Sequence, residues 1–131
     1  MIRLKYKMKH TGNPLRVIIA DRNQIYQEAL LSFARKQDNV ELIRICKTEE
    51  ELILTLKTLG ITCLIIDEGF FGFDPVEEIR SIKKHYPELI IVGLSIDGSK
   101  HMEREMMLAG VYKYLSKWNL EEDLQLLFDQ S

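Results

Sequence analysis

Two kinds of segment alternate five times along the chain from Leu15 onward. Five short runs of apolar, often β-branched residues have the composition of strands, at 16–20 (RVIIA), 40–46 (VELIRIC), 63–66 (CLII), 89–94 (LIIVGL) and 111–115 (VYKYL). Segments with apolar residues at helical spacing follow them, at about 23–37, 48–59, 75–86, 99–109 and 119–129. Because each strand pattern is followed by a helix pattern after a short connection, we expect βα units joined by right-handed crossovers into one parallel sheet.

The apolar content of these runs predicts the order of the strands. The first, third and fourth runs are continuously apolar, which suits strands that are buried on both faces. The second run contains Glu41 and Arg44 and is typical of an edge strand. We therefore expect an α/β fold of the (βα)5 type, a doubly wound parallel five-stranded sheet in the order 2-1-3-4-5 with helices on both faces. In that order Cys46 and Cys63 lie two strand spacings apart, about 9.5 Å, which is too far for a disulfide.

Local signals predict where several helices begin and end. Three helices are expected to start at capping residues, namely Thr48 with Glu51, Asp74 with Pro75 and Glu77, and Asn119 with Glu122. Gly60 and Gly110 are expected to mark the ends of the helices at 48–59 and 99–109.

Length and charge narrow the class of protein. A chain of 131 residues is the size of one domain, and a formal net charge of -2 offers no broad attraction for nucleic acid. Residues 1–13 are basic and are expected to form a flexible tail, with a single folded domain over 14–131. No apolar run approaches the ~18 residues of a membrane helix. The two cysteines lack metal-binding spacing, so we expect reduced core thiols in a cytoplasmic protein.

Candidate chemistry follows the predicted strands. Asp21 follows the first, Asp67 the third and Ser95 the fourth, and Lys117 lies just beyond the fifth. Ligands of such sheets bind at the carboxyl ends of the strands, so these four side chains should meet. Two carboxylates, a hydroxyl and an ammonium suit a phosphoryl group: one carboxylate attacks phosphorus, the other helps to hold Mg2+, and the remaining groups bind phosphoryl oxygens. Taken singly, Asp21 could be only a helix N-cap, Ser95 a loop residue and Lys117 a surface charge.

From Leu15 to Phe128 the chain resembles the receiver domain of two-component response regulators. The residues that carry the resemblance are Asp21 after RVIIA, Asp67 after CLII, Ser95 after LIIVGL, and Tyr114 and Lys117 in YLSK. The resemblance implies that Asp67 accepts a phosphoryl group with the help of Ser95 and Lys117, and that Ser95 and Tyr114 couple this site to the surface. It also implies Mg2+ held by Asp21, Asp67 and the backbone carbonyl of Gly69. The expected partners are a histidine kinase or phosphotransfer protein and a downstream protein or output domain, with a homodimer also possible. The chain would be a signalling module rather than an enzyme, and would not itself bind nucleic acid.

The sequence departs from this family at several positions around the site. Arg22 replaces the second acidic residue, so metal affinity should fall. It either points to solvent or pairs with Asp21 or Asp67. The loop after Asp67 is altered at Phe71 and Pro75, and Ile96 and Trp118 replace a small residue and a proline.

Arg22 keeps a second interpretation open, a phosphorylation-independent pseudo-receiver that acts as a protein-binding module. Two enzyme classes are disfavoured by the loop after the first strand. The sequence ADRNQIYQ lacks the Gly-rich phosphate cradle of a flavodoxin-type flavin carrier and the DxD motif of a haloacid-dehalogenase-type phosphatase.

Overall fold

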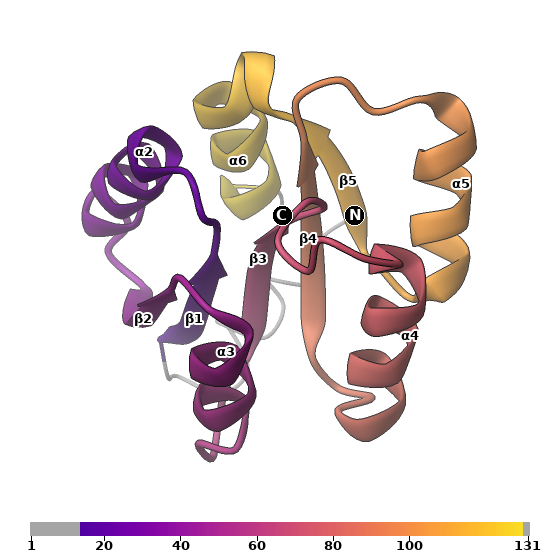
Figure 1. Cartoon of the computed structure of the whole chain (residues 1–131). Helices are drawn as coiled ribbons and strands as arrows, with labels where there is room; N and C mark the ends of the chain where they lie inside the picture. The colour runs from indigo at the N-terminus through magenta and orange to yellow at the C-terminus, as the bar shows by residue number, and fades with distance from the viewer. Residues whose placement is uncertain (1–13, 130–131) are drawn as a thin grey trace.

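A computed structural model describes residues 14–129, and the expected basic tail at 1–13 lies outside this range. Five parallel strands form one sheet in the order β2-β1-β3-β4-β5, which confirms the predicted fold class (Figure 1). The strands are β1 (Leu15–Ala20), β2 (Val40–Cys46), β3 (Cys63–Asp67), β4 (Ile90–Ser95) and β5 (Lys113–Ser116). The helices are α2 (Gln24–Arg35), α3 (Glu49–Leu56), α4 (Pro75–His85), α5 (Lys100–Ala109), the 3-10 turn η1 (Lys117–Asn119) and α6 (Leu120–Asp129).

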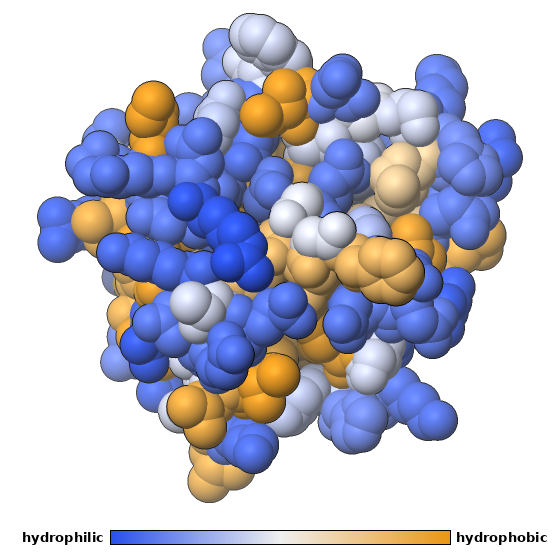
Figure 2. Space-filling model, in the orientation of Figure 1, coloured by the Kyte–Doolittle hydropathy of each residue, from blue (hydrophilic) through white to orange (hydrophobic). Residues whose placement is uncertain are grey.

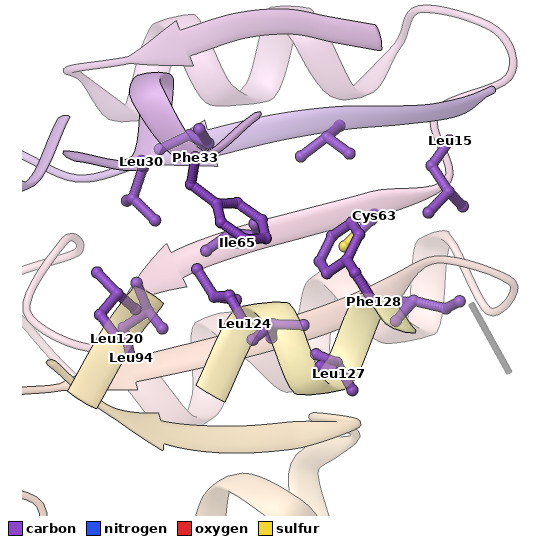
Figure 3. Close-up of a cluster of buried hydrophobic side chains, with 14 residues drawn as sticks. Leu15, Leu30, Phe33, Cys63, Ile65, Leu94, Leu120, Leu124, Leu127 and Phe128 are labelled. Carbon is purple, nitrogen blue, oxygen red and sulfur yellow. The ribbon is translucent and has the colours of Figure 1, made fainter. Parts of the chain in front are cut away.

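Helices cover both faces of the sheet and create two separate cores. On one face α2 and α6 pack over β1, β3 and β4, and the rings of Phe33 and Phe128 meet edge to face at 5.4 Å (Figure 3). On the other face α3, α4 and α5 cover a second cluster that includes Ile18, Ile66 and Ile91. The inner strands are continuously apolar because both of their faces are buried.

Of the five predicted helix starts and ends, three are correct and two are wrong. Thr48 and Glu51 form a capping box, Asp74 caps α4, and Gly110 ends α5 at a φ of 120°. Helix α3 stops at Leu56, three residues before the predicted end, and Gly60 instead lies in a turn with a φ of 81°.

The other wrong boundary is the expected cap at Asn119. This residue lies inside η1, and the hydroxyl of Ser116 caps that turn by accepting from the Trp118 amide. A helical turn therefore begins immediately after β5, which places Lys117 at the carboxyl end of the sheet.

The cysteines lie in the core as expected. Cys46 on edge strand β2 and Cys63 on β3 are separated by β1, both are fully buried, and neither forms a disulfide. Burial raises the pKa of the Cys46 thiol, despite a hydrogen bond with Thr55. In the described part of the chain, no helix is long and apolar enough to cross a membrane.

Candidate functional site

Asp21, Asp67 and Lys117 meet at the carboxyl ends of β1, β3 and β5. Parallel register brings the strand ends level, since Ala20 pairs with Ile66 and Ser95 with Ser116. The Lys117 ammonium lies 2.7 Å from Asp21 Oδ2 and 2.9 Å from Asp67 Oδ1. One cation therefore joins two carboxylates that would otherwise repel each other.

Burial differs sharply within this group of three. The side chains of Lys117 and Asp21 are each 2% exposed, whereas that of Asp67 is 20% exposed. The Lys117 ammonium also lies over the ring of Tyr26, 4.0 Å from its centroid. Asp67 is consequently the carboxylate that a reagent from solvent can reach.

Asp21 does not cap the following helix, which was the simplest explanation of this residue. Asn23 is the N-cap of α2, because its side chain accepts from the amides of Ile25 and Tyr26. Asp21 Oδ1 instead accepts from the Asn23 amide at 2.9 Å. One carboxylate oxygen thus orders the loop while the other faces Lys117.

Arg22 pairs with neither Asp21 nor Asp67, and its side chain is 49% exposed but held by contacts with other loops. Its Nε donates to the backbone carbonyl of Phe70 at 2.7 Å, and its Nη1 donates to the carbonyl of Lys47 at 3.3 Å. The guanidinium also lies 4.9 Å from the centroid of the Phe70 ring and 3.9 Å from a carboxylate oxygen of Glu49. Arg22 therefore ties three loops together and pairs with neither Asp21 nor Asp67.

The aromatic residues after Asp67 differ in how far they are exposed to solvent. Phe70 is fully buried, and the ring of Phe71 packs edge to face against it at 5.5 Å. Phe73 is 84% exposed. Apolar side chains on this face of the molecule form separate groups among hydrophilic ones (Figure 2).

Ser95 and Tyr114 both form hydrogen bonds with Glu68, a residue that was not predicted from the sequence. The Ser95 hydroxyl donates to Glu68 Oε2 at 2.9 Å, and the Tyr114 hydroxyl donates to Glu68 Oε1. Ser95 is 1% exposed, so its hydrogen bonds are made within the protein. The sequence did offer a signal for Glu68, because it is a second carboxylate directly after Asp67. Since β3 ends at Asp67, the alternation of side chains along a strand did not predict which way Glu68 would point.

The surroundings of Tyr114 perturb its ionisation. Burial of the phenol and its hydrogen bond to Glu68 raise the pKa of Tyr114 to about 12. Its hydroxyl therefore remains a proton donor throughout the neutral range.

The donors present do not make a site that would hold Mg2+ tightly. Arg22 supplies no carboxylate, the Gly69 carbonyl accepts from the Gly72 amide, and the Gly69 amide donates to Asp67 Oδ2 at 2.9 Å. Both remaining carboxylates are already joined to Lys117. Within residues 14–129, no cluster of three or more His, Cys, Asp or Glu side chains could hold a metal ion.

Comparison by sequence identifies no relatives: no family model matches the chain, and no curated protein is significantly similar. Comparison of structures does find similar folds. The response regulator RcsB of Salmonella typhimurium superposes with a TM-score of 0.79 at 23% identity, over 86% of this chain and 57% of the RcsB chain. This chain thus spans little more than half the length of that RcsB chain.

Two further structures support the same fold. A response regulator from Thermotoga maritima gives a TM-score of 0.74 at 23% identity, over 89% of this chain and 99% of its own. One from Burkholderia pseudomallei, with a phosphorylated aspartic acid, a calcium ion and citrate, gives 0.71 at 14% identity, over 88% of this chain and 67% of its own. The chain has the fold of response regulator receiver domains, and the resemblance expected from its sequence is confirmed at the level of the fold.

Proposed function

We propose that this domain is a signalling receiver that accepts a phosphoryl group on Asp67 and thereby changes a protein-binding surface. The observation that carries the proposal is the Lys117 ammonium, which lies within 2.9 Å of Asp67 and 2.7 Å of Asp21. A buried cation beside Asp67, the more exposed of these two carboxylates, can stabilise negative charge that arrives on it.

The donor would be a phosphohistidine of a histidine kinase or phosphotransfer protein. A carboxylate oxygen of Asp67 attacks phosphorus, the new P–O bond gives an acyl phosphate, and the P–N bond breaks as the imidazole leaves. Lys117 binds a phosphoryl oxygen, and Ser95 binds another if it gives up its hydrogen bond to Glu68. These steps use the chain's own residues, and divalent metal would enter only by weak competition with Lys117 for Asp21 and Asp67.

Mass spectrometry of the intact protein tests the proposal directly. After incubation with acetyl phosphate and Mg2+, we expect a slow mass increase of one phosphoryl group, which requires Asp67 and is absent in Asp67→Asn. Glu88→Gln, at an exposed loop position, is the matched carboxylate control and should be labelled normally. Unlabelled wild-type protein at saturating acetyl phosphate and Mg2+ would refute phosphorylation at Asp67.

A phosphorylation-independent binding module is the second candidate. Two observations favour it: Arg22 removes a metal ligand, and Glu68 already binds the hydroxyls of Ser95 and Tyr114. In such a module the affinity for its partner would not change with acetyl phosphate, but would respond to substitution of Tyr114 or of the exposed face of α5.

A further inference from the structure

Glu68 lies directly after β3, next to the carboxyl ends of β4 and β5. Its own amide donates to the Leu94 carbonyl at 2.9 Å, so the backbone next to Asp67 is attached to β4. Its two carboxylate oxygens accept from separate hydroxyls, one from Ser95 on β4 and one from Tyr114 on β5. A single anionic group therefore connects the ends of β3, β4 and β5.

These bonds use up the donor capacity of both hydroxyls. Each hydroxyl carries one proton and can donate one hydrogen bond. While Ser95 donates to Glu68 at 2.9 Å, its proton is not available to an oxygen bound to Asp67. Ser95 Oγ also accepts from the Asp97 amide at 3.2 Å, so the hydroxyl that Glu68 holds also orients the loop that leads to α5.

Gly98 shows how closely this loop covers the two hydroxyls. A Cβ atom built at Gly98 would lie 2.2 Å from the Tyr114 hydroxyl oxygen and 2.8 Å from Ser95 Oγ. No side chain fits there while Tyr114 points inward. The conformation of residues 96–99 is therefore coupled to the position of Tyr114.

We propose that Glu68 is a positioning residue that permanently supplies the anionic oxygens that a phosphoryl group on Asp67 would supply only transiently. It holds Ser95 and Tyr114 inward, and with them the loop before α5, in the absence of any phosphoryl donor. The proposal rests on the proposed function, because it concerns how the same site controls the same surface. It predicts that phosphorylation must compete with Glu68 for Ser95.

Nuclear magnetic resonance of the full chain at neutral pH, without a phosphoryl donor, tests this role. In Glu68→Ala we expect large shifts of the Asp97 and Gly98 amide resonances. Hydrogen exchange at the Asp97 amide should be faster by up to about tenfold, the factor expected when its hydrogen bond to the neutral Ser95 hydroxyl is lost. Glu88→Ala is the matched control and should leave these amides unchanged. Because Glu68 is only partly buried, its truncation should leave the fold intact.

Titration of Tyr114 adds a readout that a purely structural role for Glu68 would not move. Tyrosinate absorbance, with Tyr114→Phe as the reference, should show that the pKa of Tyr114 is lower in Glu68→Ala than the wild-type value of about 12, while burial of the phenol, the larger cause, keeps it above the usual value of about 10. Glu68→Gln keeps an acceptor oxygen but no charge, and should restore the amide positions while leaving the pKa of Tyr114 between these values.

Two results would overturn the proposal: unchanged Asp97 and Gly98 amides in Glu68→Ala, or the same pKa of Tyr114 in that variant and the wild type. The outcome is separate from the test of phosphorylation, since Asp67→Asn removes the acceptor but should leave the Glu68 contacts and these amides as they are. Gly98→Ala provides an independent check. It should displace Tyr114 by steric overlap and reproduce the Glu68→Ala spectrum around residue 97.

Discussion

At the scale of single residues, Lys117 has the largest electrostatic role in the site. It is the cation shared by Asp21 and Asp67, and it lies almost entirely out of contact with water. Charges in such a place are stabilising only as a complete set, because removal of one partner leaves the others buried without compensation.

Replacement of Lys117 by methionine should therefore destabilise the protein strongly. We expect Lys117→Met to lower the free energy of unfolding by about 3–5 kcal/mol, measured by urea denaturation at pH 7. The control is Lys36→Met, since Lys36 and its partner Glu121 are 64% and 70% exposed, and its loss should cost at most about 1 kcal/mol. Similar costs for the two variants would contradict the assignment of a buried, shared cation.

A second prediction at this scale concerns the effect of Arg22 on the affinity for Mg2+. Arg22→Asp should add a carboxylate near Asp21 and raise the affinity for Mg2+, followed by the fluorescence of Trp118, the single tryptophan. Arg22→Ala loses the same contacts to Phe70 and Lys47 without adding a ligand, and its Mg2+ affinity should stay at the wild-type level. Equal affinity in Arg22→Asp and wild type would show that this position does not limit metal binding.

At the scale of elements, the start of α3 links local sequence to packing at the sheet edge. The Glu51 carboxylate accepts from the Lys47 amide at 2.6 Å and from the Thr48 amide at 3.3 Å, and pairs with Arg44 of β2 at 2.9 Å. Hydrogen bonding from the Lys47 backbone is the main reason that the pKa of Glu51 is lowered. The capping box thus connects a helix to the neighbouring edge strand.

The sign of the resulting pH dependence follows from that lowered pKa. A carboxyl whose pKa is lower in the folded state contributes stability above its unfolded pKa, about 4.3, and loses it as the pH falls through the folded value. Wild type should therefore be more stable than Glu51→Gln at pH 7, and the difference should shrink as the pH falls below about 4.3. Thr48→Ala, expected to cost about 0.5–2 kcal/mol, should remain destabilising in acid as well as at pH 7. A Glu51→Gln difference that persists in acid would contradict the role of the charge.

At the scale of the whole molecule, stability depends on helices that close both faces of one sheet. Helix α6 is the last of these and lies beside α2 over the core drawn in Figure 3. Its side chains alternate between that core and solvent, so the same helix offers a buried and an exposed leucine for comparison.

Leu124 and Leu126 test the contribution of α6. Leu124 is fully buried, and Leu124→Ala should lower the free energy of unfolding by about 2–5 kcal/mol. Leu126 is 64% exposed, and Leu126→Ala should stay within about 0.5 kcal/mol of wild type. Urea denaturation monitored by circular dichroism measures both. Equal effects would mean that α6 does not dock as described.

The alternation of strand patterns and helix patterns along the chain was enough to predict the strands and their order. It also predicted that Asp21, Asp67 and Lys117 would meet. These features follow from the periodicity of the backbone and the geometry of parallel βα units, which bring strand ends to one edge whatever the side chains do there. Cys46 and Cys63 illustrate this, because strand order alone ruled out their disulfide.

Only the tertiary structure decided which partner each polar side chain takes. Glu68 binds Tyr114, 46 positions away, and Arg22 turns to the carbonyl of Phe70, 48 positions away. Such choices depend on small differences in distance, burial and competing acceptors between segments remote in sequence, and no local pattern encodes them. The sequence by itself therefore determined the scaffold and the identity of the strand-end groups. Packing determined that the hydroxyls of Ser95 and Tyr114 donate to Glu68, because folding brings the ends of β3, β4 and β5 together.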